Sequence, residues 1–591
     1  MKDTFVNPYN FVPFGGEINN PGHKKKREEV FSKEGESLVS GWFDLEIYIK
    51  TPLIIPGKFY KDNGKRKCAF LKLPDGDGTM QYAIPASKLR GIIRSAFEAA
   101  TDSCVPFVLR EKNRMSQRIP KFGALHDRGL LCYENGIWSL YEGEVVAMEK
   151  VEANPERSGF HYPDDREVTV KTGDYDEKKH GVVQYNFPVN TGKPYHIAYL
   201  QKGKLINKWN SNEPYDDLSS VLGGDSSFYG KKIRNINIGP VRDLRNALDR
   251  ELRGEGHGVP VYYFCVSTSG DDDSMEDRIV YLSNASVGRI PRKRSWKEVM
   301  GDYVPCEVKE GLCPACLLFG TKEGEEYKSR LRFTDAFPAS DISSEYRLIN
   351  ALGLPKYTAF EYYLKKPAED AVYWNYDIYG VKGKRIGGKT STKYRYLKEV
   401  SPRGRKFYWH FNPSTDAPLG KFPSEIEMMT GGTFHSRIYF DSITKQQLDD
   451  LMWVISFGDN KKDSNLCYKL GHARPHGYGS CKFVISSLNI RTISKDEKGD
   501  ISFSVKSEVP EIKALSYGIE KENVRALLKM ADLNALADQN VDYPGELEKS
   551  FYWFSKNHKN RGTMQVLHDA LDSELSQKNH VKPPKPQDAE T

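Results

Sequence analysis

Three cysteines that lie close together in the sequence could hold a metal ion. Cys313 and Cys316 form a Cys-Pro-Ala-Cys motif, and Cys306 lies a short way upstream. A CxxC motif places two thiolates on one tight turn, which is the spacing that tetrahedral zinc requires. The sequence therefore predicts a structural zinc site at Cys306, Cys313 and Cys316, with His257 or Cys265 as the fourth ligand. Buried free thiols are the alternative.

A glycine-rich segment at 471–480, GHARPHGYGS, combines basic and aromatic residues. Glycine lets backbone N–H groups approach a phosphate closely, and an arginine can pair with a phosphate through two hydrogen bonds. A tyrosine in such a segment could stack on a base. The segment is a candidate nucleic-acid-binding loop, with Arg474, Gly477, Tyr478 and Gly479 as contacts. The alternative is an ordinary surface connection between a helix and a strand.

The most basic stretch of the chain is 382–406, where ten cations accompany one acid, Glu399, and tyrosines are interleaved. Cations suit the backbone of a single-stranded nucleic acid, and rings suit its bases. The predicted contacts are Lys384, Arg385, Lys389, Lys393 and Arg395. Residues 383–390 also fit the phosphate-loop pattern GxxxxGK[ST], but the flanking residues show neither a buried strand before it nor an apolar helix after it.

Candidates for catalysis are fewer. No Ser-His-Asp order or HExxH motif stands out. His476 could transfer a proton, although a histidine in such a loop more often binds RNA. Asp62 could position or deprotonate a ribose 2′-hydroxyl, and the alternative is an ordinary turn aspartate.

Two strand–helix units are expected to position these residues. A strand at Trp42–Ile49 alternates apolar and polar residues, and a helix follows from about Pro85 with an apolar stripe that runs to Ala100. A second strand at Thr433–Phe440 precedes a helix that Thr444 caps, and then come the glycine-rich segment and a strand at 481–490. The pattern predicts an α+β fold with a ferredoxin-like core.

The chain has 591 residues, 38% of them hydrophobic, and a net charge of +7. It holds no run of about 18 apolar residues, and its nine cysteines are too sparse for a disulfide framework, so we expect a cytoplasmic protein with no membrane partner. The expected parts are a leader (1–40), the first part of the core (41–104), a β-rich insertion (105–300), the zinc turn with the second part of the core (301–490), and a helical C-terminal extension with a disordered tail (491–591). Within the insertion, residues 129–151 and 193–209 are predicted to form β-hairpins with turns at 134–136 and 201–203. Within the extension, helices are predicted at 519–531, 545–554 and 563–575.

Four motifs resemble the RAMP superfamily, in particular the backbone subunits of type III CRISPR effectors. IPASKLRGIIRSAFE (84–98) resembles the IPGSSLKG-x-hR helix, and CPACLLFG (313–320) is similar to the CPxCxLFG zinc turn. SRLRFTDAFP (329–338) is similar to the SRLxFxDA strand. TGGTFHSRIYFDSI with its helix and GHARPHGYGS matches the last repeat and the glycine-rich loop. The motifs occur in family order and cover roughly 42–104 and 300–490.

The resemblance implies an RNA-recognition-motif-like fold that binds guide RNA and helps present target RNA among other CRISPR effector subunits. It implies Ser87, Lys88, Arg90 and Arg94 as phosphate contacts beside Arg474 and Tyr478. Family members that cut target RNA use an aspartate between the first strand and this helix. In this chain Asp62 is the only acid of residues 51–70, and the usual glycine pair before the aspartate is missing.

An RNA-binding subunit is therefore the leading prediction. An endoribonuclease that cuts target RNA or processes guide precursor is the alternative, and a protein-interaction scaffold that uses the C-terminal extension is a third.

Overall fold

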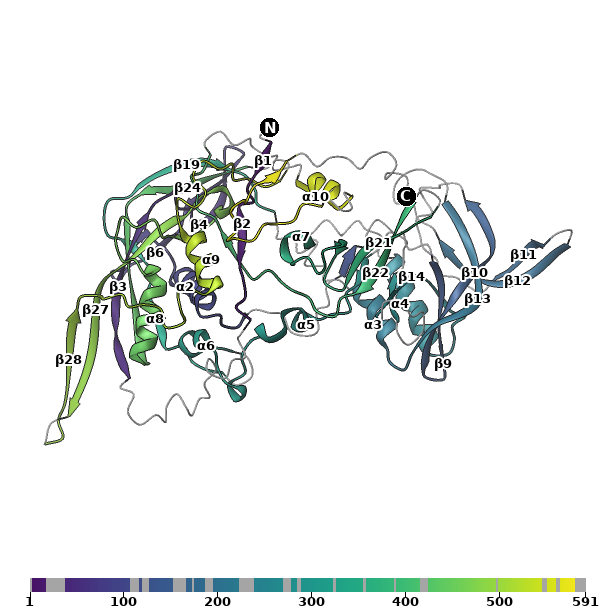
Figure 1. The fold of residues 1–591 in the computed structure, drawn as a ribbon, viewed down its shortest axis with the longest axis horizontal. Helices are drawn as coiled ribbons and strands as arrows, with labels where there is room; N and C mark the ends of the chain where they lie inside the picture. The colour runs from purple at the N-terminus through teal and green to yellow at the C-terminus, as the bar shows by residue number, and fades with distance from the viewer. Residues whose placement is uncertain are drawn as a thin grey trace. The chain divides into compact units, whose positions relative to one another are not determined.

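The structure is a computed structural model in which the chain forms two compact units (Figure 1). One unit comprises 1–108, 300–365 and 401–584, and the other comprises 109–299, 366–400 and 585–591. The residues that the structure describes are 3–16, 38–106, 116–118, 127–151, 166–172, 175–185, 195–222, 239–268, 278–283, 289–322, 326–353, 358–386, 389–414, 423–495, 498–544, 550–559 and 564–579.

A seven-stranded sheet organises the first unit. Its main path is β17 (Leu331–Phe333), β25 (Thr433–Ile443), β3 (Val39–Ile49), β27 (Ser480–Lys495) and β26 (Tyr468–Lys469); β18 (Phe337–Pro338) pairs with β25, and β28 (Ile501–Glu508) pairs with β27. All of these pairs are antiparallel. Along the chain, α2 (Ala86–Ala100) lies between β3 and β17, and α8 (Lys445–Ser456) lies between β25 and β27.

One face of this sheet packs into the largest core. Phe43, Leu45 and Ile47 alternate along β3 and are fully buried, as the period of two predicts. They join the apolar stripes of α2 and α8 in one hydrophobic cluster. The predicted cap of α8 is confirmed, because Thr444 and Gln447 form a reciprocal capping box. The helices therefore cover one face of the sheet, and the residues that alternate with the core ones lie on the other face.

Smaller elements surround this sheet. A second sheet runs in the order β19 (Ser343–Ile349), β24 (Ser424–Gly431), β5 (Lys65–Phe70) and β4 (Pro56–Asp62). Three strand pairs are β6 (Lys72–Pro74) with β7 (Met80–Tyr82), β2 (Tyr9–Val12) with β23 (Arg405–Tyr408), and β1 (Thr4–Phe5) with β29 (Gln577–Lys578). The helices are α6 (Pro314–Phe319), α7 (Phe360–Tyr363), α9 (Glu522–Ala531) and α10 (Ser550–Lys559), with 3₁₀ turns at Gly301–Tyr303, Val308–Glu310 and Arg474–His476.

The C-terminal extension is less helical than its sequence suggests. Residues 491–495 continue β27, and β28 pairs with β27 in antiparallel register. The third predicted helix, at 563–575, is wrong, since residues 564–575 form turns and irregular chain. The described part of the predicted leader belongs to the folded unit, because β1 and β2 pair with strands from much later in the chain.

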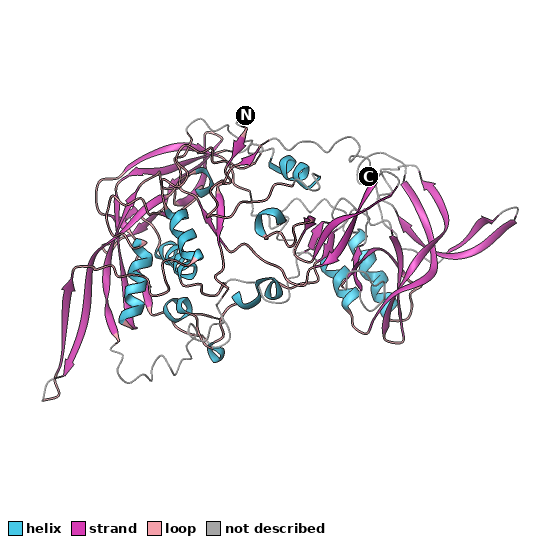
Figure 2. Ribbon diagram, in the orientation of Figure 1, coloured by secondary structure: helices cyan, strands magenta, loops and turns pink. Residues whose placement is uncertain are grey.

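The second unit is mostly strands (Figure 2). Its ten-stranded sheet runs β11 (Arg166–Thr172), β12 (Tyr175–Tyr185), β13 (Tyr195–Trp209), β10 (Ile137–Val151), β9 (Asp127–Glu134), β14 (Val259–Ser267), β22 (Lys389–Tyr396), β21 (Ile378–Ile386) and β20 (Ala371–Trp374), with β15 (Arg278–Ser283) on β14. Helices α3 (Glu213–Leu222), α4 (Gly239–Leu252) and α5 (Trp296–Met300) and the pair β8 (Ser116–Arg118) with β16 (Arg289–Pro291) complete the described elements.

Two expectations about this region need correction. The hairpin predicted within 193–209 is wrong, because residues 195–209 form one strand that pairs with β10 along its length. Residues 366–400 were assigned to the core, but they belong to the second unit. The hairpin turn predicted at 134–136 is confirmed: Asn135 and Gly136 both have positive φ, as a type I′ turn requires. No helix in the described parts of the chain is long and apolar enough to cross a membrane.

Candidate functional site

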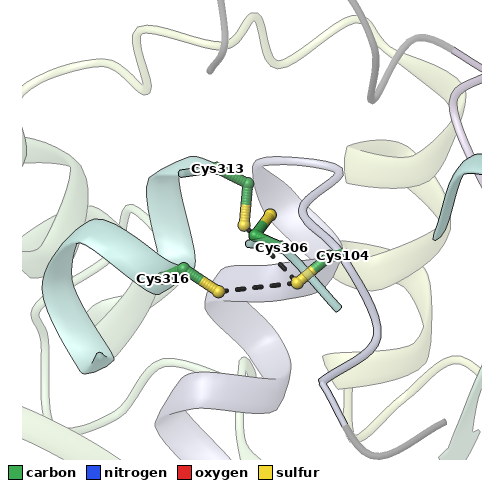
Figure 3. Close-up of side chains that lie close together, drawn as sticks. All are labelled: Cys104, Cys306, Cys313 and Cys316. Carbon is green, nitrogen blue, oxygen red and sulfur yellow. Dashed lines mark hydrogen bonds between the residues drawn. The ribbon is translucent and has the colours of Figure 1, made fainter. Parts of the chain in front are cut away.

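Four buried cysteines meet beside the C-terminal end of α2. They are Cys104, Cys306, Cys313 and Cys316, and their sulfur atoms all lie within 4.8 Å of one another (Figure 3). The Cys104 Sγ is 3.5 Å from the Cys316 Sγ and 3.7 Å from the Cys313 Sγ. No disulfide joins them. The three predicted zinc ligands are therefore brought together with a fourth thiol.

This geometry fits a tetrahedral metal site. Zinc binds thiolates at about 2.3 Å, so two sulfur atoms of a tetrahedron lie about 3.8 Å apart. The two short separations here are close to that value. Four protein ligands fill the coordination of zinc, which is typical of a structural rather than a catalytic site. The donor set therefore suits a zinc ion that would cross-link the segments carrying the thiols.

Cys104 is the ligand that sequence reasoning missed. It follows α2 and is more than 200 residues away from the CxxC turn, so no local spacing signals it. The fold joins the two segments directly, because the backbone N–H of Ala315 donates to the hydroxyl of Ser103 at 3.1 Å. His257 and Cys265, which the sequence suggested as fourth ligand, belong to the second unit and have no part in this cluster.

Arg94 lies beside the cluster and not at the protein surface. Its guanidinium donates to Glu98 at 2.7 Å, to the Gly320 carbonyl at 3.2 Å and to the Cys316 sulfur at 3.9 Å. Only 7% of the residue is exposed. A guanidinium can be buried when its donors are used in this way. Arg94 positions the turn that carries Cys316, and its predicted contact with a phosphate stays a prediction.

Arg90 has a similar role one turn earlier in α2. Its guanidinium donates to the carbonyl of Phe319, the last residue of α6, and lies 6.0 Å from the centre of that residue's ring. Burial lowers the pKa of Arg90 most, and the positive charge of Arg94 lowers it further. Arg90 is half-buried, and its hydrogen bond links α2 to the end of α6. Its predicted phosphate contact stays a prediction.

The glycines of the glycine-rich loop serve packing. Gly471, Gly477 and Gly479 all have positive φ, which favours glycine. A Cβ atom on Gly479 would lie 1.8 Å from the Leu470 carbonyl oxygen, and one on Gly477 would lie 2.8 Å from that of Phe411. Both residues are buried. The glycines therefore let the loop approach other backbone, and the predicted phosphate contacts at Gly477 and Gly479 stay predictions.

Tyr478 is also turned inward. It is 5% exposed and packs in a small cluster with Ile54, Cys68 and Met428. A ring in that position cannot stack on a base without leaving its cluster. Tyr478 fixes the loop against the second sheet, and its predicted contact with RNA stays a prediction.

A buried lysine holds the loop from below. The Nζ of Lys469 donates to the carbonyls of Gly477 at 2.6 Å and Tyr478 at 3.2 Å. The hydroxyl of Thr51 donates to the Gly477 carbonyl at 2.9 Å and accepts from the N–H of Ser480 at 2.8 Å. Burial lowers the pKa of Lys469 to about 7. The backbone of the loop is thus fixed by polar groups inside the protein.

The residues that stay available to a ligand are few. Ser87 and Lys88 are exposed at the beginning of α2, and Arg474 is exposed in the loop. Burial lowers the pKa of His472, and the charges of Arg474 and then Lys88 lower it further, so the three basic groups are close together. The Arg474 guanidinium lies 4.9 Å from the ring centre of Tyr408. The start of α2 and the glycine-rich loop thus each present an exposed cation near His472.

An aspartate positions the start of α2. The first N–H of the helix, that of Ala86, donates to the carboxylate of Asp335 at 2.7 Å. A carboxylate at a helix N-terminus is favoured by the helix dipole and satisfies a donor that has no partner within the helix. This contact joins the SRLRFTDA segment to the IPAS segment at the residue before Ser87.

The basic stretch 382–406 does not form one surface. Its first part forms the β21–β22 hairpin of the second unit, where Lys393 is exposed and Arg395 is partly buried. The side chains of Lys384, Arg385 and Lys389 lie outside the described residues. The hairpin also excludes a phosphate loop at 383–390, because an antiparallel strand stands where a helix is needed.

The last three cations of that stretch are used inside the first unit. Arg403 pairs with Asp569 at 2.7 Å, and Arg405 lies 3.4 Å from the Asp102 carboxylate. The Nζ of Lys406 lies 3.6 Å from the ring centre of Tyr9, and burial lowers its pKa to about 8. Composition alone could not separate these buried cations from exposed ones.

The two catalytic candidates lie in different settings. Asp62 ends β4 and forms an ion pair with Lys67 at 3.0 Å, which is the ordinary hairpin role. His476 ends the 3₁₀ turn of the glycine-rich loop, and its Nε2 is buried without a hydrogen-bond partner. Burial, and then the neighbouring His472, lower the pKa of His476, so its imidazole is neutral at pH 7. The structure thus gives Asp62 a structural partner and leaves one nitrogen of His476 unused.

Comparison with known proteins adds little to these observations. No protein-family model matches the chain, and no curated protein matches it. Among solved structures, one match is a chain from the type III-B Cmr-beta complex bound to cognate target RNA, with a TM-score of 0.17 and 9% identity, covering 76% of this chain and 98% of that chain. Similarity at that TM-score does not establish a common fold.

Proposed function

We propose that this chain is an RNA-binding subunit of a type III-like CRISPR ribonucleoprotein, in which it holds guide RNA and helps present target RNA among other effector subunits. The observation that carries the proposal is the basic surface formed by Ser87, Lys88, His472 and Arg474. It presents exposed cations at the start of α2 and in the glycine-rich loop, and such cations favour phosphate groups.

The arrangement of strands supports a ferredoxin-like core. The chain order β3–α2–β17–β25–α8–β27 and the sheet order β17-β25-β3-β27 correspond to a split βαβ-βαβ arrangement with antiparallel neighbours. The RAMP-like motifs lie where this core needs them: one is α2, one is the α6 turn, and one is the loop before β27. We propose the RAMP-like assignment from these motifs together with this topology.

The four-thiol cluster has a structural part in this proposal. A zinc ion bound by Cys104, Cys306, Cys313 and Cys316 would link the C-terminal end of α2 to α6. Because Ser87 and Lys88 begin the same helix, the metal would hold the phosphate-binding end of α2 in place. The metal supplies cross-linking and takes no part in a reaction.

Binding of single-stranded RNA tests the basic surface. Lys88→Gln with Arg474→Gln should weaken binding of a labelled 20-nucleotide RNA by about tenfold or more in fluorescence anisotropy, because both phosphate contacts are lost. The slope of log affinity against log salt should fall by about 1.4, at about 0.7 for each contact to a single strand. Lys445→Gln, an exposed lysine of α8, is the matched control and should change neither quantity. Equal affinity of the double variant and the unchanged protein would refute the proposed surface.

The class of the RNA is a separate question. Purification from the native host followed by sequencing of the bound RNA should yield small RNAs derived from CRISPR repeats. Random fragments of cellular RNA would instead indicate a general RNA-binding protein.

An endoribonuclease is the second candidate, and the unpartnered Nε2 of His476 favours it. A neutral imidazole can accept a proton from a ribose 2′-hydroxyl. If the chain cuts RNA through this group, His476→Ala should abolish cleavage while binding persists. Asp62→Ala tests the aspartate in the same assay. Cleavage that neither substitution changes would remove both residues from consideration.

A further inference from the structure

The face of the large sheet that the helices do not cover carries a row of aromatic and basic side chains. Pairing places Arg332 of β17 beside Tyr439 of β25, Tyr439 beside Trp42 of β3, and Trp42 beside Asn489 of β27. One pair further along β3, Arg437 lies opposite Asp44. These residues alternate with the buried core residues of the same strands, so they share the other face.

The rings and guanidinium groups of this row are in contact. The Arg332 guanidinium lies 4.7 Å from the ring centre of Tyr439, and the Arg437 guanidinium lies 5.3 Å from that of Trp42. The ring centres of Trp42 and Tyr439 are 6.3 Å apart. Cation–π contacts of this kind hold a flat side chain in a fixed orientation. We call Arg332, Tyr439, Trp42 and Arg437 the sheet-face row.

The carboxylates on this face already have partners. Asp44 accepts two hydrogen bonds from Arg437, at 2.7 and 3.2 Å, and one from Ser487 at 2.8 Å. Glu46 accepts a hydrogen bond from the hydroxyl of Tyr48. Among the described residues, Arg332 has no ion pair and is exposed. The face therefore offers rings and a cation to a ligand but little free negative charge.

The indole of Trp42 adds a second observation. Its Nε1–H is buried and has no hydrogen-bond partner in the described chain, although the residue itself is partly exposed. An indole donor normally finds an acceptor when it is buried. A ligand that displaced the guanidinium covering the ring and supplied a carbonyl oxygen would satisfy this donor. Nucleobases have both the flat ring and the carbonyl acceptors.

We propose that the sheet-face row is a second binding site, which takes unpaired nucleobases of a single-stranded nucleic acid. Base stacking on aromatic rings is tolerant of sequence, and arginine adds cation–π and phosphate contacts. The row holds no aliphatic residue, unlike the β27–β28 hairpin, where Ile493, Phe503 and Val505 are more than half exposed. That contrast favours a nucleic acid over a protein on this part of the sheet. The inference rests on the proposed function only in taking RNA as the ligand.

The two sites should differ in what they recognise. The start of α2 and Arg474 would bind phosphates, whereas Trp42 and Tyr439 would bind bases. An RNA strand without bases should therefore retain the first contact and lose the second. This difference allows each proposal to fail without the other.

The test compares a 20-nucleotide uridine RNA with an abasic strand of the same length in fluorescence anisotropy. Trp42→Leu with Tyr439→Leu should weaken binding of the uridine strand by about tenfold or more, since stacking contributes to each base. The same variant should leave binding of the abasic strand within about twofold. Trp42→Phe with Tyr439→Phe keeps both rings and should restore most of the affinity. Tyr552→Leu, an exposed tyrosine of α10, is the matched control.

The outcomes separate the two sites. If the leucine variant binds both strands as the unchanged protein does, the sheet-face site is refuted and the phosphate surface stands. If the leucine variant loses uridine binding but Lys88→Gln with Arg474→Gln has no effect on either strand, the phosphate surface is refuted and the sheet face stands. A leucine variant with altered oligomeric state and unchanged RNA binding would assign the row to protein contact.

A crosslinking measurement covers the case in which the leucine variant does not fold. Irradiation of the unchanged protein with a 4-thiouridine RNA should give crosslinked peptides that contain Trp42 or Tyr439. Crosslinks confined to peptides from 84–98 and 471–480 would overturn the sheet-face site.

Discussion

Two regions, the α6 turn beside α2 and the glycine-rich loop, are each held in place by different chemistry. At the C-terminal end of α2, four thiols and the guanidinium of Arg94 fix the α6 turn. Near its N-terminal end, the glycine-rich loop is fixed by the buried amine of Lys469 and by the hydroxyl of Thr51. The first region should depend on a metal ion, and the second should depend on the charge of one lysine. Polar residues of both regions resemble ligand contacts in the sequence but stabilise the fold.

The largest expected effect is loss of the thiol cluster. Cys104→Ser should reduce zinc, measured by elemental analysis, well below one ion per chain and destabilise the first unit by more than about 4 kcal/mol, because a structural metal site contributes directly to folding. Thermal unfolding in the presence and absence of a chelator measures the second quantity. Cys265→Ser is the matched control, since Cys265 lies outside the cluster. A Cys104→Ser protein that retains one zinc ion would contradict the assignment of the fourth ligand.

A smaller effect is expected at Arg94. Arg94→Met leaves the carboxylate of Glu98 buried without its partner, and breaking a buried pair in this way costs about 3–5 kcal/mol. Arg94→Met with Glu98→Leu removes both charges and should recover much of that loss in chemical denaturation. The salt dependence of RNA binding should stay the same in any folded variant. If the slope of log affinity against log salt falls by about 0.7 in the variant, Arg94 does contact a phosphate.

The sequence predicted the elements better than it predicted the direction of single side chains. The strand at 42–49, the helix from about 85 and the capped α8 follow from periodicity, and the structure has them. Three of four cysteines follow from a local motif. Cys104 could not be found in this way, because only the packing of α2 against α6 brings it there. In the same way, α2 exposes Lys88 but buries Arg94, although both carry a charge on the same helix.

The last prediction concerns pH and separates the two regions most clearly. Burial lowers the pKa of Lys469 to about 7, whereas a lysine in the unfolded chain titrates near 10.4. Between these values the unfolded chain binds the additional proton, so this group makes the protein more stable as pH rises from about 7 towards about 10, by at most about 1.4 kcal/mol per pH unit. Below pH 7 the lysine is charged in both states, and the full cost of burying the charge remains.

The difference in unfolding free energy between the unchanged protein and Lys469→Met should therefore change with pH across this range. Chemical denaturation at pH 7, 8 and 9 measures it. Lys445→Met, at an exposed position of α8, is the control, and its effect on the unfolding free energy should not change with pH. Because Lys469 donates to carbonyls of the loop and not to the thiol cluster, the same variant should keep its zinc content. A variant that loses both the pH dependence and the metal would mean that the loop and the α6 turn unfold as one, and that the two regions are not independent.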